Sequence, residues 1–162
     1  NAFCIGKDQL FYPSPYIGDM GDVRTVKALR ESVKRMEELL EVKPQIVACD
    51  MHPSYNTRTA AEEMGLPVFL VQHHYAHILS CMAENEWTTK KQVIGVSFDG
   101  TGYGTDGTIW GGEILLADYD SFKRWGCIEP FAQTGGDASA KEGWRIAVSL
   151  LGKIYGNRSF DY

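Results

Sequence analysis

The sequence predicts a mixed α/β fold, because segments with strand patterns alternate with segments of helical periodicity in both halves of the chain. In each half, strand patterns lead into helix patterns, and a polar connection over residues 88–92 separates the halves. We therefore expect two α/β lobes, residues 1–88 and residues 92–162.

The first half opens with two well-marked elements. Strand-favouring residues on both sides of the polar group at residues 7–9 predict a hairpin over residues 3–15. Between Asp22 and Pro44, apolar residues recur every three or four positions, which predicts an amphipathic helix. Asp22 is placed to cap this helix, and Pro44 is placed to end it.

Short apolar runs and stop signals define the rest of the first half. The runs at residues 45–49 and 68–71 predict buried strands. Residues 55–64 predict a helix that Gly65 stops, and residues 73–87 predict a further helix.

The second half repeats the change from strand to helix patterns. Residues 93–98, 108–117 and 122–130 predict three strands. A helix pattern then runs from about residue 138 to 155.

Composition and charge exclude several classes of protein. The 162 residues carry a formal net charge of −5, so we expect no nucleic-acid partner. No apolar run approaches the roughly 18 residues of a membrane span, so we expect no membrane partner. The four cysteines form no CxxC pair, which favours reduced thiols and a cytoplasmic location. The chain begins at Asn1 without a Met, so we expect a segment of a longer protein.

Three of the four histidines lie together where a predicted strand gives way to a helix. His73 and His77 are four residues apart, so on a helix they project from one face and can clamp a metal. The spacing matches the H-E-x-x-H protease motif, but His74 stands where that motif needs its glutamate base, which argues against a protease. The alternative is a helix with ordinary packed or exposed histidines.

A glycine-rich stretch follows the strand that starts at Val93. The strand is expected to deliver Asp99 at its tip, and the glycines between Gly100 and Gly104 let backbone N–H groups approach a polyanion. Asp106-Gly107 is a suitable two-residue turn. The alternative is a glycine-rich hairpin with no ligand.

Asp99 and the histidines are both expected at strand ends, so they can converge. His73, His77 and Asp99 would then form a set of two imidazoles and one carboxylate with open positions, which suits iron or zinc.

A third candidate site opens the last predicted helix. Gly135, Gly136 and Asp137 form a turn whose N–H groups can hold an anion, with Lys141 adding positive charge and Arg145 one turn further on. The alternative is an ordinary helix entry with Asp137 as its cap.

Six stretches of the chain, in family order, resemble the Kae1-like domain of the HypF carbamoyltransferases of hydrogenase maturation. These stretches are residues 1–4, 50–55, 72–77, 98–104, 110–113 and 135–137. The resemblance implies the actin-like ATPase (ASKHA, ribonuclease H-like) fold, with two lobes around a nucleotide cleft. Here both ends of that fold would be truncated, with the first strand and much of the second lobe lying outside the chain.

The resemblance also implies roles for particular residues. His73, His77 and Asp99 match the family's ligands for a divalent metal, either iron or zinc, with Mg²⁺ as a further option. Asp99 and Lys141 are the expected catalytic residues. The expected nucleotide-binding residues are Gly100, Thr101, Gly102, Tyr103, Gly104, Gly135, Gly136 and Asp137.

The reaction implied by the resemblance uses carbamoyl phosphate and ATP to make carbamoyl-adenylate. The carbamoyl group then passes to the C-terminal cysteine of the partner protein HypE, on the route to a cyanide ligand of [NiFe] hydrogenase. We expect the truncated chain alone not to complete this reaction. The alternatives are an antibiotic O-carbamoyltransferase, a tRNA threonylcarbamoyl-transfer relative, and a non-catalytic module that binds nucleotide or docks a partner.

Overall fold

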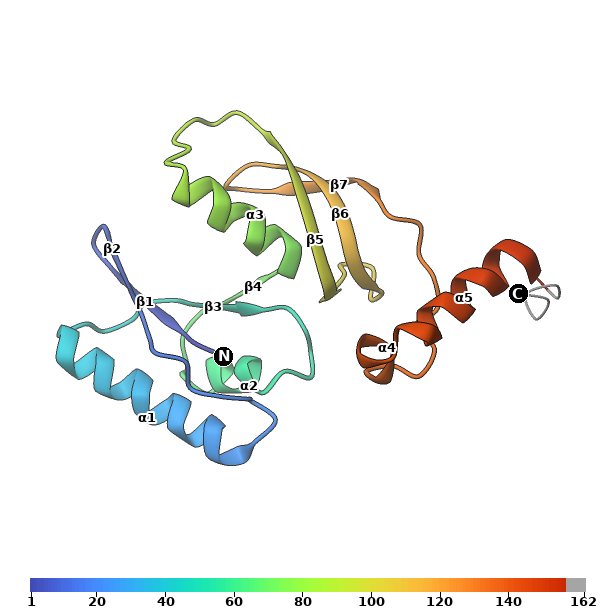
Figure 1. The fold of residues 1–162 in the computed structure, drawn as a ribbon. Helices are drawn as coiled ribbons and strands as arrows, with labels where there is room; N and C mark the ends of the chain where they lie inside the picture. The colour runs from blue at the N-terminus through green and yellow to red at the C-terminus, as the bar shows by residue number, and fades with distance from the viewer. Residues whose placement is uncertain (157–162) are drawn as a thin grey trace. The chain divides into compact units, whose positions relative to one another are not determined.

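The computed structural model describes residues 1–156 and shows the predicted mixed α/β class (Figure 1). The elements in chain order are β1 (Cys4–Lys7), β2 (Leu10–Pro13), α1 (Val23–Leu40), β3 (Val47–Asp50), α2 (Asn56–Glu62), β4 (Val68–Val71), α3 (His73–Glu84), β5 (Val93–Tyr103), β6 (Ile109–Ala117), β7 (Phe122–Cys127), α4 (Ala138–Lys141) and α5 (Gly143–Tyr155). None of the helices within residues 1–156 combines the length and the apolar character needed to cross a membrane.

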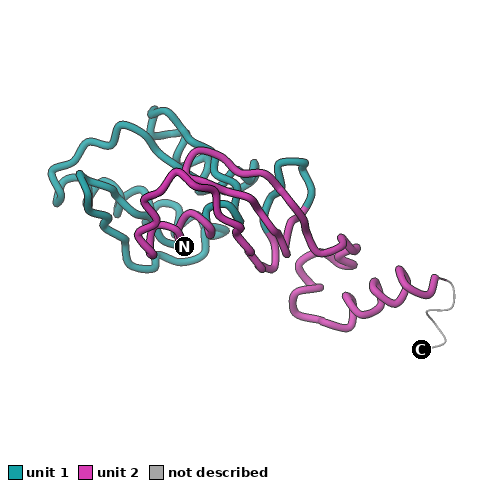
Figure 2. Tube along the Cα trace, turned by 90° about the horizontal axis from the view of Figure 1, so that it is seen from above, with its two compact units in different colours: residues 1–76, 102–108 teal, residues 77–101, 109–162 magenta. Residues whose placement is uncertain are grey.

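The chain divides into two compact units (Figure 2). Unit 1 contains residues 1–76 and 102–108, and unit 2 contains residues 77–101 together with the chain from residue 109 onward. This grouping cuts α3 and β5 and does not fall at residues 88–92. The division into lobes at residues 1–88 and 92–162 therefore remains a prediction.

Unit 1 begins with the predicted hairpin, in which β1 and β2 pair antiparallel. Helix α1 begins after Asp22, whose carboxylate accepts a hydrogen bond from the Arg24 backbone N–H at 2.8 Å, as predicted for a cap. The helix ends at Leu40, before Pro44, because Glu41 takes the left-handed conformation with φ 50° and closes the helix. The unit's buried cluster contains Met20, Val26 and Leu29, with Phe3, Ile17, Val33 and Ala60 packed around it.

The parallel pair β3 and β4 positions the start of α3. The two strands pair from Val47 with Val68 to Asp50 with Val71, so both end at the same edge. Helix α3 begins two residues after Val71. Asp50 is therefore held beside the first turn of α3 by backbone pairing.

Unit 2 contains the sheet β5-β6-β7, and here the predicted end of the first strand was wrong. Strand β5 continues past Phe98 to Tyr103, so Asp99 lies within the strand and not at its tip. The glycines at 100 and 102 lie within β5, which is hydrogen-bonded to β6 in this sheet. A Cβ at Gly111 would lie 3.1 Å from the Asp99 carbonyl oxygen, so this close approach favours glycine.

The C-terminal helix pattern also differs from the expectation of one continuous helix. Glu142 takes φ −117° and ψ 80°, which interrupts the helix and separates α4 from α5. Asp137 stands at the N-cap position of α4, as the alternative expected, but it has helical backbone angles and its side chain makes no capping hydrogen bond. The Ser139 hydroxyl instead donates to the Gly136 carbonyl at 2.7 Å.

Candidate functional site

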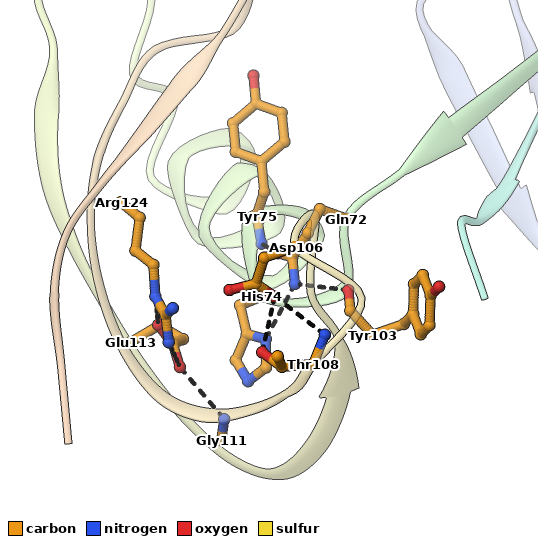
Figure 3. Close-up of polar contacts among 9 residues, drawn as sticks. All are labelled: Gln72, His74, Tyr75, Tyr103, Asp106, Thr108, Gly111, Glu113 and Arg124. Atoms are coloured by element: carbon orange, nitrogen blue, oxygen red, sulfur yellow. Dashed lines mark hydrogen bonds and ion pairs between the residues drawn. The ribbon is translucent and has the colours of Figure 1, made fainter. Parts of the chain in front are cut away.

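The first turn of α3 is fixed by the buried side chain of Gln72 (Figure 3). Its Oε1 accepts the Tyr75 backbone N–H at 2.9 Å, which caps the helix. Its Nε2 donates to the Tyr103 carbonyl at 3.2 Å and lies 3.2 Å from Nδ1 of His74. One amide thus joins the helix start, a fully buried histidine and the end of β5. The sequence analysis assigned no role to Gln72.

Glycine at position 102 is required by the packing against this turn. A Cβ there would lie 2.6 Å from Cε1 of His74 and 2.9 Å from Cβ of His73. A Cβ at Gly100 would meet nothing within 4 Å. The two glycines of the predicted phosphate loop therefore differ: packing demands the glycine at 102 and leaves open space at 100.

His73 makes a close polar contact within unit 1. Its Nδ1 lies 2.9 Å from Oδ2 of Asp50, and the two side chains are 32% and 18% exposed. The other oxygen of Asp50 accepts the His52 backbone N–H at 2.8 Å. His52 itself stacks on the Tyr55 ring, with centroids 4.1 Å apart.

His77 and Asp99 form the corresponding contact in unit 2. Nε2 of His77 lies 3.6 Å from Oδ2 of Asp99. Oδ1 of Asp99 accepts the backbone N–H of Gly100 at 2.6 Å. The His77 side chain is 58% exposed, so solvent and small ligands reach it.

The three predicted metal ligands lie on α3 and β5. His73 and His77 are one turn apart on α3, so the helix itself sets their spacing. Within unit 2, the Asp99 carboxylate contacts the ring of His77. Two imidazoles and one carboxylate form a donor set that fits zinc or iron and leaves positions for water or substrate. Metal binding itself stays a prediction.

The cysteines take no part in this donor set. All four, Cys4, Cys49, Cys81 and Cys127, are free thiols. Burial raises the pKa of the Cys49 thiol, which stands next to Asp50 in the chain. Cys49 therefore carries less thiolate at neutral pH than an exposed cysteine.

The predicted phosphate loop consists of two parts with different backbones. Residues 100–103 belong to β5, and only residues 104–108 form a turn. In that turn Gly104 donates to the Thr108 carbonyl at 2.8 Å, and Asp106 accepts the N–H and hydroxyl of Thr108 at 3.0 and 2.7 Å. A turn is present as expected, but it has three residues, 105–107, and not two. The Gly107 N–H donates to the Gly104 carbonyl at 3.0 Å, and Gly107 has φ 77°. Nucleotide contact by residues 100–104 stays a prediction.

The third candidate site lies around α4. Gly135 and Gly136 have φ of 93° and 57°, so this turn favours glycine. Lys141 is exposed at the end of α4. Arg145 pairs with Glu142 at 2.6 Å, so much of its charge is locally neutralised. The nucleotide-binding role of Gly135, Gly136 and Asp137 and the catalytic role of Lys141 stay predictions.

A buried ion pair in unit 2 was missed by the sequence analysis (Figure 3). Glu113 is 1% exposed and accepts two hydrogen bonds from Arg124, at 2.6 and 3.1 Å. The Arg124 guanidinium also lies over the Trp110 ring, 4.1 Å from its centroid. The available signal was a carboxylate inside a strand that is otherwise apolar, but its partner depends on the pairing of β6 with β7.

Two family models match this chain in succession. The HypF Kae1-like domain matches residues 1–84, and the second subdomain of the carbamoyltransferase Kae1-like domain matches residues 95–161. The chain belongs to the HypF Kae1-like family. The expected resemblance is thereby confirmed.

Curated relatives and a solved structure carry the same HypF name. The chain is 41% identical over 155 residues to carbamoyltransferase HypF2 of Cupriavidus necator, covering 93% of this chain and 19% of that protein. It is 39% identical over 157 residues to carbamoyltransferase HypF of a Synechocystis species, covering 97% of this chain and 20% of that protein. The chain thus spans about a fifth of the length of these HypF proteins.

The fold also agrees with a solved HypF structure. A crystal structure of full-length HypF in the phosphate- and nucleotide-bound form superposes with a TM-score of 0.88 at 39% identity. The match covers 99% of this chain and 25% of the full-length HypF chain. The mixed α/β architecture is therefore that of the Kae1-like part of HypF.

Proposed function

We propose that this chain is the Kae1-like part of a cytoplasmic carbamoyltransferase that acts in hydrogenase maturation. In this proposal, carbamoyl-adenylate made from carbamoyl phosphate and ATP donates its carbamoyl group to the C-terminal cysteine of HypE. The observation that carries the proposal is the contact of His77 with Asp99, with His73 one helical turn earlier on α3, in a chain of the HypF family. The four free thiols support a reducing location.

The three residues would hold one divalent metal ion. Nitrogen donors favour iron or zinc over Mg²⁺, which prefers an all-oxygen shell. When bound, such an ion supplies Lewis-acid stabilisation of charge on a carbonyl or phosphate oxygen.

In the transfer step, the HypE cysteine sulfur bonds to the carbamoyl carbon as its thiol proton is lost. The bond from that carbon to the adenylate phosphate oxygen breaks, and AMP leaves. Residues 100–104 and 135–137 would contact the nucleotide, where the small glycines let the backbone approach phosphate oxygens. Lys141 would offset charge on the departing AMP.

Metal analysis of the chain tests this proposal. The chain is loaded with zinc or ferrous iron, and excess metal is removed. We expect one bound ion per chain. In His73→Ala and His77→Ala we expect most of the bound metal to be lost. His52→Ala is the matched control, because it removes a histidine that lies outside the ligand set, and it should keep the ion. Unchanged stoichiometry in His73→Ala and His77→Ala would overturn the metal site.

Nucleotide binding separates the enzyme from the non-catalytic module. Titration of the metal-loaded chain with ATP should show binding that weakens when His77 is replaced. ATP binding that is equal with and without metal would favour a nucleotide-binding module that uses its histidines for structure alone.

A further inference from the structure

We propose that Asp50 is a positioning residue that sets the tautomer and orientation of His73, so that Nε2 of His73 faces the metal. The inference rests on the proposed metal site and goes beyond its three ligands. It assigns a role to a carboxylate that the sequence analysis did not include among the site residues.

The contact between the two side chains decides the tautomer. Oδ2 of Asp50 lies 2.9 Å from Nδ1 of His73, within hydrogen-bond distance. An ionised carboxylate only accepts hydrogen bonds, so Nδ1 must carry the proton. In a neutral ring the lone pair then lies on Nε2, which becomes the atom available to a metal.

Backbone pairing holds Asp50 in place for this contact. Asp50 is the last residue of β3 and pairs in register with Val71 of β4. The Met51 N–H donates to the Val71 carbonyl at 3.1 Å, which continues the pairing past the strand end. Because α3 starts two residues after Val71, the strand register brings the carboxylate to the first helical turn.

The second oxygen of Asp50 fixes the carboxylate plane. Oδ1 accepts the His52 backbone N–H at 2.8 Å while Oδ2 contacts the His73 ring. The Asp50 side chain is only 18% exposed, so water competes weakly for either oxygen. A carboxylate held at both oxygens orients the ring more strictly than a freely rotating one. Partners of this kind typically contribute about 10–100-fold to metal affinity.

The test uses the full 162-residue chain and three variants at Asp50. Asp50→Asn keeps the shape, but its single oxygen cannot serve both His73 and the His52 N–H. Asp50→Ala removes both contacts, and Asp50→Glu keeps the charge. Asp120→Asn is the matched control, because Asp120 is an exposed acid in the connection after β6. Circular dichroism establishes that each variant is folded.

The first measurement is the His73 tautomer in the metal-free chain, read from two-bond ¹H–¹⁵N correlations at a pH where the ring is neutral. We expect the Nδ1–H form in the unmodified chain and in Asp120→Asn. We expect a shift toward the Nε2–H form in Asp50→Asn and Asp50→Ala. An unchanged tautomer in Asp50→Ala would overturn the proposal.

The second measurement is the zinc dissociation constant, obtained by competition with a chromophoric chelator. We expect binding about 10–100-fold weaker in Asp50→Asn and Asp50→Ala, with partial recovery in Asp50→Glu. If Asp50→Asn and Asp50→Ala both bind zinc within twofold of the unmodified chain, the role of Asp50 would also be overturned. If the unmodified chain binds no zinc or iron, the proposed metal site fails, and the tautomer measurement still decides whether Asp50 orients His73.

Discussion

Arg124 donates through Nε to Oε2 of Glu113 at 2.6 Å, and the acidic side chain is almost completely buried. The pair joins β6 to β7 close to the irregularity in their register between Ile114 and Leu115. A buried carboxylate without its cation is costly because it has lost its hydration and its counter-charge. The pair therefore makes β7 a required partner of β6.

Replacing Arg124 by Met should destabilise the chain strongly. The change keeps an aliphatic stem over Trp110 but leaves Glu113 without its cation. We expect a loss of about 3 kcal/mol, at the lower end of the range for broken buried pairs, because Arg124 is 28% exposed. Urea unfolding followed by circular dichroism measures it. Lys27→Met, which breaks an exposed pair with Glu31, should change stability little, and equal effects of the two changes would contradict the prediction.

Two alanine substitutions in β5 should have very different effects. Gly102→Ala places a Cβ 2.6 Å from the buried His74 ring, so we expect a loss of about 1–3 kcal/mol and weaker zinc binding through the displaced first turn of α3. Gly100→Ala meets no atom within 4 Å and should be tolerated. Thermal unfolding and zinc titration of both variants check this. If Gly102→Ala and Gly100→Ala destabilise the chain equally, packing does not explain the glycine at position 102.

Zinc should stabilise the folded chain. A ligand that binds only the folded state at a free concentration about 100 times its Kd adds about 2.7 kcal/mol. Replacing His77 or Asp99 by Ala should remove most of this gain, and EDTA should reverse it. The comparison is the unfolding temperature with zinc and with EDTA. A zinc-dependent rise that survives both substitutions would indicate binding elsewhere.

The cap of α1 predicts a pH-dependent contribution to stability. Hydrogen bonds from the Arg24 side chain and backbone lower the pKa of Asp22 below its ordinary 3.8. A group with a lowered pKa in the folded state stabilises the protein above its ordinary pKa, and this contribution is lost as pH falls through the folded-state pKa.

Asp22→Asn isolates that contribution, because Asn caps helices about as well as Asp but carries no charge. The variant should melt below the unmodified chain at neutral pH, and the difference should shrink as pH falls below 3.8. Asp22→Ala, which also removes the capping oxygen, should melt lower at neutral pH. A difference between the Asn variant and the unmodified chain that stays constant across this pH range would argue against the charged cap.

Local patterns were sufficient to predict the hairpin, α1 and β4, because periodicity and capping residues act within a few positions. The length of β5 was not predictable, because glycines at positions 100 and 102 disfavour a strand when considered alone. Pairing with β6, the hydrogen-bonded neighbour of β5 in the sheet, outweighs that preference. The interruption at Glu142 was missed although Gly143, a weak helix former, follows it directly.

The candidate site also has some features that local sequence predicts and others that depend on strand pairing. The spacing of His73 and His77 is a property of one helix, so it could be read directly from the sequence. The approach of Asp50 to His73 depends on the register of two parallel strands, and the Glu113 contact depends on a strand pair with an irregular register. Such pairings join residues distant in the chain and have no short-range signature.

The stacking of Arg124 on Trp110 also gives the protein an internal optical probe. Trp110 is 2% exposed, whereas Trp125 and Trp144 are 67% and 59% exposed. An indole shielded from water emits at shorter wavelength than a hydrated one, so the short-wavelength edge of the fluorescence reports the surroundings of Trp110. Quenchers dissolved in water will reduce the fluorescence of the exposed Trp125 and Trp144 first. Trp87 is half-buried, so in a Trp87→Phe variant the signal that survives these quenchers will follow the β6–β7 pairing without any attached label.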